Sequence, residues 1–323
     1  MIFGNWAVCL NLLSMASLLA LALGIVQLAL VYPVRQLCGH LAPEEQKYLL
    51  LGWASLPWLS PIMALLLSTV STLEADGTLA NSAMRFHWHH ADWFLFDSWH
   101  MLPLIIGALW LATGITRTGI RTLHQRKQYQ QLKLLSSPDV TKQGLNWLPT
   151  EQSFACTAGL INPQVFVARG LAKQLSPEQL GIVLVHEQVH IRHLDNQSLS
   201  LMNLACSLYP AKIAQPMMNC FALATEQLAD AAAARSVSAT EVAMTLVKVT
   251  RLNRSSAPED CPAFLTEIEP HSLQIRVNQL LNPVSASNWL NAGLLTSLLL
   301  IILGAVSSVD SLHHGVEWML GHG

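Results

Sequence analysis

The chain of 323 residues is strongly apolar and carries little charge: 52% of its residues are hydrophobic, 12% are charged, and the mean hydropathy is +0.38. This composition excludes an ordinary soluble protein and predicts an integral membrane protein. The formal net charge of −2, without a long run of Lys or Arg, gives no support for direct nucleic acid binding, and we expect none.

Four long apolar stretches predict four transmembrane helices. The first has no charged residue and no basic segment before it, and it is longer than the apolar part of a signal peptide. An uncleaved helix is therefore favoured over a cleaved leader. The second contains Pro57 and Pro61, which transmembrane helices tolerate when neighbouring helices satisfy the freed carbonyl groups. The predicted spans are residues 6–32, 48–72, 99–116 and 289–309.

The basic residues near the span ends predict the orientation of the chain. Five basic residues follow the third span within residues 117–133, whereas residues 73–98 contain four acidic residues and only Arg85. The basic side is expected to face the cytoplasm. Both termini, the loop of residues 73–98 and a short tail of residues 310–323 are then outside, and residues 117–288 form a cytoplasmic domain.

The cytoplasmic domain is predicted to begin with a helix and short strands. Residues 117–135 have the pattern of a basic amphipathic helix that continues from the third span and interacts with anionic lipid of the bilayer. Residues 147–148 and 164–168 are predicted strands, with Asn162 and Pro163 forming the turn before the second.

Residues 176–196 (SPEQLGIVLVHEQVHIRHLDN) contain the pattern H-E-x-x-H and are predicted to form a helix. This spacing puts His186 and His190 one turn apart on the same face, where both imidazoles can bind one Zn²⁺. Glu187 is placed to act as general base toward water at that metal. A structural pair of surface histidines is the alternative. Asp195, at the end of the stretch, either caps or positions the end of this helix or is an ordinary polar residue where the chain leaves the helix.

A third metal ligand is expected from a separate helix, because catalytic zinc sites use three protein ligands and one open position. Residues 217–235 form an Ala-rich helical pattern whose only acids are Glu226 and Asp230, four apart on one face. Glu226 is the candidate ligand, and Asp230 is the candidate partner for the free nitrogen of a ligating His. A solvated acidic edge on a surface helix is the alternative.

These segments, together with FACTAGLINPQVFVA at residues 154–168, resemble the zinc metallopeptidase domain of the BlaR/MecR-type membrane antirepressor family. More distantly, HtpX-like membrane proteases share the H-E-x-x-H helix and the E-x-x-x-D helix. The resemblance implies an α-helical membrane protein with a mainly α (α+β), gluzincin-like zinc domain. It implies ligand roles for His186, His190 and Glu226, a general base at Glu187, and support from Asp230. Arg276, in a stretch similar to the family's closing helix, would buttress the acidic helix.

Zinc peptidases of similar layout bind an extended substrate along an edge strand beside the active-site helix. Gln164, Val165, Phe166 and Val167 are the candidates for this strand, and an ordinary core strand fits the same residues equally well.

The resemblance also implies a function. The expected protein is a signal-responsive zinc endopeptidase of the bacterial inner membrane that cleaves a cytoplasmic BlaI/MecI-type repressor. An HtpX-like quality-control protease and a non-catalytic metal-binding signalling protein are the alternatives, and homo-oligomerisation is left open. Only residues 310–323 follow the fourth span, so the penicillin-binding sensor domain of the best-known family members is not expected.

Histidines concentrate in both outer segments. Imidazole clusters bind Zn²⁺, Cu²⁺ or Ni²⁺, so a second metal ion that acts as the signal is a hypothesis for these segments. Tolerated histidines within an interfacial belt of aromatic residues are the alternative. The candidate ligands are His87, His89, His90, His313 and His314.

Overall fold

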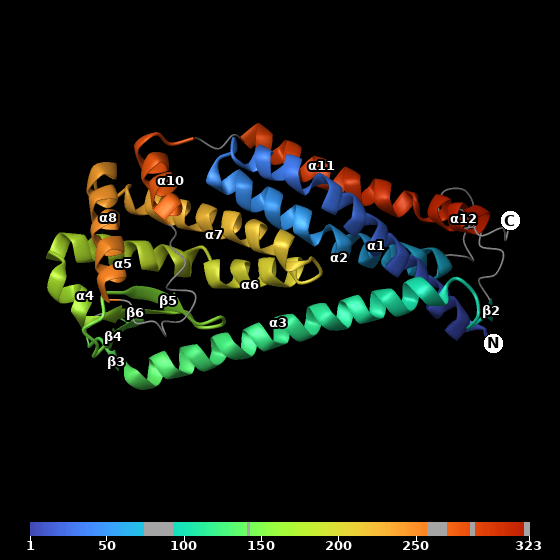
Figure 1. Ribbon diagram of the computed structural model, residues 1–323, viewed down its shortest axis with the longest axis horizontal. Coiled ribbons are helices and arrows are strands. Elements are labelled where there is room, and N and C mark those ends of the chain that lie inside the picture. Colours follow the sequence, from blue (N-terminus) through green and yellow to red (C-terminus); the bar gives the residue numbers. More distant parts are fainter. Residues whose placement is uncertain (74–92, 141–142, 257–269, 285–287, 320–323) are drawn as a thin grey trace.

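The computed structural model describes residues 1–73, 93–140, 143–256, 270–284 and 288–319. It is an elongated, mostly helical molecule, with a bundle of long helices at one end and a small sheet packed among shorter helices at the other (Figure 1). The helices are α1 (Asn5–Cys38), α2 (Pro43–Leu73), α3 (Met101–Leu135), α4 (Arg169–Gln174), α5 (Pro177–Arg192), α6 (Asp195–Cys206), α7 (Ala211–Ala233), α8 (Ala239–Ser256), α10 (Pro270–Leu281), α11 (Asn288–Ser307) and α12 (Val309–Met319). The strands are β1 (Ile2–Phe3), β2 (Trp93–Phe94), β3 (Ser137–Pro138), β4 (Leu145–Leu148), β5 (Ala155–Ala158) and β6 (Gln164–Ala168).

Three of the described helices are long and apolar enough to cross a membrane. A bent pair at the C-terminal end, with 47° between its two parts, makes a fourth candidate when it is counted as one span. The helices run past the predicted limits: α3 continues without a break from the third predicted span through residues 117–135. The candidate segments are Trp6–Cys38, Pro43–Leu67, Met101–Leu135, and Thr296–Ser307 with Ser311–Met319.

The sheet has the strand order β3-β4-β6-β5, with β4 and β6 parallel and the other pairs antiparallel. Side chains of β6 alternate between two apolar layers, because successive residues of a strand point to opposite faces. Phe166 packs toward Tyr129 and Leu132 of α3, whereas Val165 and Val167 pack with Leu184 of α5. The strand is thus buried between α3 and α5.

The prediction that Gln164, Val165, Phe166 and Val167 form an edge strand is therefore wrong. Strand β6 pairs with β4 on one side and with β5 on the other, so its backbone groups are already used. The alternative of a core strand is what the structure shows. The edge on the α5 side of the sheet is β5.

The helices around the predicted site pack directly on the apolar helices that are long enough to cross a membrane. Leu50 and Leu56 of α2 share one buried cluster with Met202 of α6 and Phe221 of α7. In the same region the hydroxyl of Tyr209 donates a 2.6 Å hydrogen bond to Gln27 Oε1 of α1. The sheet-containing end and the long-helix bundle consequently share a continuous core.

A local break shapes the end of α5. Helix α5 begins with a capping box, in which Ser176 and Gln179 satisfy each other's backbone N–H groups, and Pro177 holds its first position. It ends where Leu194 adopts a left-handed conformation (φ 53°), which is uncommon for a residue with a branched side chain. Helix α6 starts at the next residue, and this reversal turns Asp195 back toward α5.

Candidate active site

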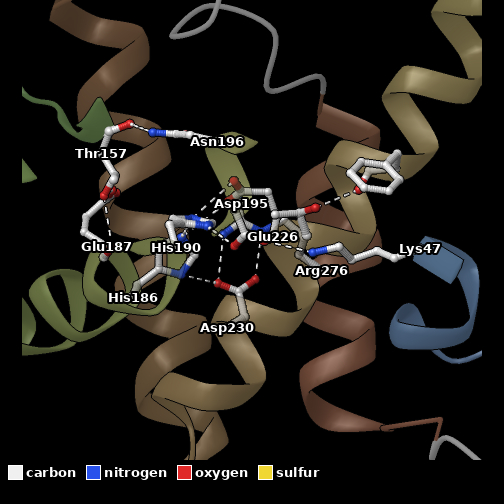
Figure 2. A network of polar contacts seen from close by, with 12 residues as sticks. Lys47, Thr157, His186, Glu187, His190, Asp195, Asn196, Glu226, Asp230 and Arg276 are labelled. Carbon is white, nitrogen blue, oxygen red and sulfur yellow. Dashed lines mark hydrogen bonds and ion pairs between the residues drawn. The ribbon is translucent and has the colours of Figure 1, made fainter. Parts of the chain in front are cut away.

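Three predicted ligands from two helices converge on one point (Figure 2). His186 and His190 lie one turn apart on α5, and their Nε2 atoms are 3.1 Å from each other. Glu226 comes from α7: its Oε2 lies 3.4 Å from Nε2 of His186, and its Oε1 lies 3.6 Å from Nε2 of His190. The three ligand atoms form the kind of group that can hold a metal ion.

The donor atoms fit zinc. Tetrahedral zinc with ligands at about 2.0–2.1 Å separates neighbouring ligand atoms by roughly 3.4 Å. The observed separations of 3.1, 3.4 and 3.6 Å bracket that value. Two imidazoles and one carboxylate also leave one coordination position open, as in catalytic sites.

Each imidazole is oriented through its other nitrogen by a buried carboxylate. Asp230 Oδ1 lies 3.0 Å from Nδ1 of His186, and Asp195 Oδ2 lies 2.8 Å from Nδ1 of His190. An Nδ1–H that donates to a carboxylate leaves Nε2 free to ligate a metal. Asp230 thus contacts His186, and Asp195 has the equivalent contact with the second histidine.

These carboxylates change the acidity of both histidines when no ion is bound. Burial by itself would lower the pKa of His186, but hydrogen bonds to Asp230 and Glu226 outweigh burial and raise that pKa to about 10. Burial would also lower the pKa of His190, and its hydrogen bond to Asp195 raises it above the ordinary value. Protons therefore compete with a metal for both imidazoles.

Arg276 of α10 holds the acidic face of α7 together. Its Nε and Nη2 donate to the two carboxylate oxygens of Asp230 at 2.7 and 2.8 Å, and its Nη1 lies 3.0 Å from Oε2 of Glu226. Although burial opposes ionisation, the guanidinium charge keeps the pKa of both carboxyls below their usual range. Arg276 thus contacts both acids of α7 at once.

A second cation reaches the site from the start of α2. Lys47 Nζ lies 2.8 Å from Oδ1 of Asp195, whose other oxygen contacts His190. The Lys47 ammonium also lies 5.5 Å from the ring centre of Phe221 on α7. Sequence reasoning missed this contact, because residues 148 positions apart meet only through the packing of α2 on α6.

The candidate base, Glu187, is held on the sheet side of α5. Its side chain is buried, and the hydroxyl of Thr157 on β5 lies 2.8 Å from Glu187 Oε2 and 2.9 Å from the Glu187 carbonyl oxygen. Asn196 of α6 donates to the backbone carbonyls of Thr157 and Gly159 at the end of the same strand. Strand β5 is thus tied to both helices of the site, a role that the sequence did not reveal.

Two of the remaining candidate ligands lie away from this site. His313 and His314 lie on α12, at the opposite end of the molecule from α5 (Figure 1). His87, His89 and His90 lie outside the described residues.

Residues 142–284 match the family model of peptidase family M48. The matched segment extends from just before β4 to just after α10, and it contains His186, Glu187, His190, Glu226 and Arg276. No match was found among curated proteins. The match supports membership of this domain in the zinc-dependent M48 metallopeptidases, and the apolar helices outside it indicate a membrane-associated metallopeptidase.

Proposed function

We propose that the chain is a membrane-embedded zinc endopeptidase in which His186, His190 and Glu226 hold one Zn²⁺ and Glu187 is the general base. The observation that carries the proposal is the convergence of three ligand atoms from α5 and α7, with the far nitrogen of each imidazole on a buried carboxylate. A pair of histidines that served only packing would not need this arrangement.

The residues of the site would have separate roles in peptide hydrolysis. A bound Zn²⁺ supplies Lewis-acid chemistry toward the peptide carbonyl and water. Glu187 takes the proton from the attacking water and delivers it to the leaving amine as the C–N bond breaks. Thr157 keeps the Glu187 carboxylate in place through its hydroxyl contact.

The substrate is proposed to extend along β5 rather than β6. Strand β5 pairs only with β6 among the described strands, and alternate backbone groups of an antiparallel strand point away from its partner. A peptide added to that edge would run beside Glu187, because Thr157 of β5 contacts this residue directly.

By the resemblance of the motif segments to antirepressors, the proposed substrate is a cytoplasmic repressor of the BlaI/MecI type. The domain is then cytoplasmic, in a bacterial inner membrane, with both termini outside, and the signal is a metal ion bound at the far end of the molecule. Quality-control proteolysis of membrane proteins is the second candidate. It is favoured by the packing of α6 and α7 on α2, which brings the site close to the membrane helices.

The test combines metal content with proteolysis in detergent-purified full-length protein. Wild type and Glu187→Gln are expected to retain about one zinc ion each, and His186→Ala and Glu226→Ala to be depleted. Among these four proteins only wild type should cleave, whereas Glu178→Gln, a control at an exposed acid on the same helix, should cleave as wild type does. Zinc retained together with full cleavage in Glu226→Ala would contradict the ligand assignment.

The substrate proposal is tested in the same preparation. A repressor encoded beside this gene and an unfolded membrane protein are offered separately, with and without added metal. Cleavage of the repressor alone supports the regulatory role, and cleavage of the membrane protein alone supports quality control. Bound zinc without cleavage of either substrate supports the non-catalytic alternative.

A further inference from the structure

A second group of potential metal ligands lies on α12. Within the described residues, His313, His314 and Glu317 bring ligand atoms to within 4.8 Å of one another. Nε2 of His313 lies 3.5 Å from Oε1 of Glu317, and Nδ1 of His314 lies 3.4 Å from Oε2 of the same carboxylate. Both distances are close to the roughly 3.4 Å between neighbouring ligands of a tetrahedral zinc ion.

The burial of the three side chains favours a preorganised binding site over a cluster of mobile surface side chains. The side chains of His313 and Glu317 are 5% and 18% exposed, whereas that of His314 is 44% exposed. Two donors are thus fixed by packing, and the third faces outward, where an ion can enter. A helix-surface ion pair would not require a buried imidazole.

The buried imidazole connects α12 to other helices. The ring of His313 lies 5.4 Å from the ring of His100 and 5.6 Å from that of Trp99, centre to centre, just before α3 begins. The backbone carbonyl of His100 accepts a 2.7 Å hydrogen bond from Ser14 of α1. An ion that fixed His313 would therefore fix the contact of α12 with the residues just before α3, which are themselves bonded to α1.

We propose that His313, His314 and Glu317 bind one divalent transition-metal ion, with Cu²⁺ and Zn²⁺ preferred over Mn²⁺. Two imidazoles and one carboxylate suit these borderline ions, whereas Mg²⁺ and Ca²⁺ prefer oxygen-only sites. The site lies at the opposite end of the molecule from α5 (Figure 1), so it is distinct from the proposed catalytic centre. The role of this site as a metal sensor rests on the proposed function as a regulatory protease, whereas ion binding does not depend on that function.

Metal binding is measured in full-length protein without a histidine tag, in detergent, with the catalytic ligands removed by His186→Ala and His190→Ala. Titration with Cu²⁺ or Zn²⁺ should show one ion bound per chain. Adding His313→Ala and His314→Ala should abolish that binding, and adding Glu317→Gln should weaken it by about tenfold or more. His124→Ala, an exposed histidine of α3, is the matched control and should leave binding unchanged.

Electron paramagnetic resonance of the Cu²⁺ form supplies a readout that does not depend on proteolysis. Nitrogen splitting from two imidazoles, lost in the His313→Ala and His314→Ala variant, is expected. Binding that survives this variant but disappears on replacing His87, His89 and His90 would overturn the proposal, as would an absence of binding by the parent protein.

Regulation is a separate arm of the test in protein with intact catalytic residues. A change in the repressor cleavage rate on metal addition, absent in the His313→Ala and His314→Ala variant, supports the input role. Normal cleavage without any metal response contradicts that role, whereas absent cleavage with intact copper binding points to failure of the proposed proteolytic function.

Discussion

Replacement of Asp195 by Asn tests how the buried carboxylate serves two partners at once. Asp195 accepts from Nδ1 of His190 on one oxygen and from Lys47 on the other, both at 2.8 Å, and is almost fully buried. An Asn side chain has one accepting oxygen and one donating amide, so it can satisfy only one of these donors. If the amide faces His190, the histidine carries its proton on Nε2, the atom proposed to bind zinc.

The expected result for Asp195→Asn is a loss of zinc affinity of about 10–100-fold, the usual effect of disturbing a partner of a ligating histidine. This loss equals about 1.4–2.7 kcal/mol. Lys47→Met alone should change zinc affinity much less, because the carboxylate still accepts from His190. The double variant Lys47→Met/Asp195→Asn should recover part of the loss, because the Asn oxygen is then free to turn toward His190.

The four proteins form a double-mutant cycle, measured by competition with a chromophoric zinc chelator near neutral pH. A Glu187→Gln background prevents self-cleavage during the titration. Unchanged affinity in Asp195→Asn, or a double variant no better than that single variant, would refute the reasoning that Lys47 dictates the orientation of the Asn side chain.

Three further predictions concern the other contacts of the site. Thr157→Val should lower the cleavage rate by about 10–100-fold with zinc content unchanged, because Glu187 loses the hydroxyl that holds it; kinetics with parallel elemental analysis would show this. Arg276→Met should lower the free energy of unfolding by about 3–5 kcal/mol in detergent denaturation, with Arg276→Lys recovering only part and the exposed Arg251→Met as control. Zinc binding should release protons near pH 7, because the pKa of His186 is about 10. Zinc affinity should therefore rise with pH and level off above that value; calorimetry in buffers of different ionisation enthalpy measures this release, and a pH-independent affinity would contradict it.

Sequence patterns predicted the parts of the site that lie within single helices. The spacings His186 to His190 and Glu226 to Asp230 follow from helical geometry, so their shared faces could be inferred before any fold was known. The role of Asp195 could not be chosen, because it depends on the left-handed turn at Leu194, which composition does not signal.

Contacts that depend on the packing of distant segments were not predictable. The apolar sequence of β6 fits an edge strand and a core strand equally well. Only its pairing with β4 on one side and β5 on the other decides between them. Neither Lys47 nor Thr157 lies in a motif that points to the site. Both acquire their roles when α2 and β5 pack against the helices of the site.

The charges around the site explain why a divalent ion suits it. Four carboxylates surround the two histidines, and two permanent cations oppose them, which leaves two negative charges when both imidazoles are neutral. A Zn²⁺ ion cancels that remainder, and without the ion protons on the imidazoles reduce it, in line with the raised pKa of both histidines. Exchange of protons for the ion is thus the expected response of the site to zinc, and it begins with His186, whose pKa is raised to about 10. The charged groups are Glu187, Asp195, Glu226, Asp230, Lys47 and Arg276.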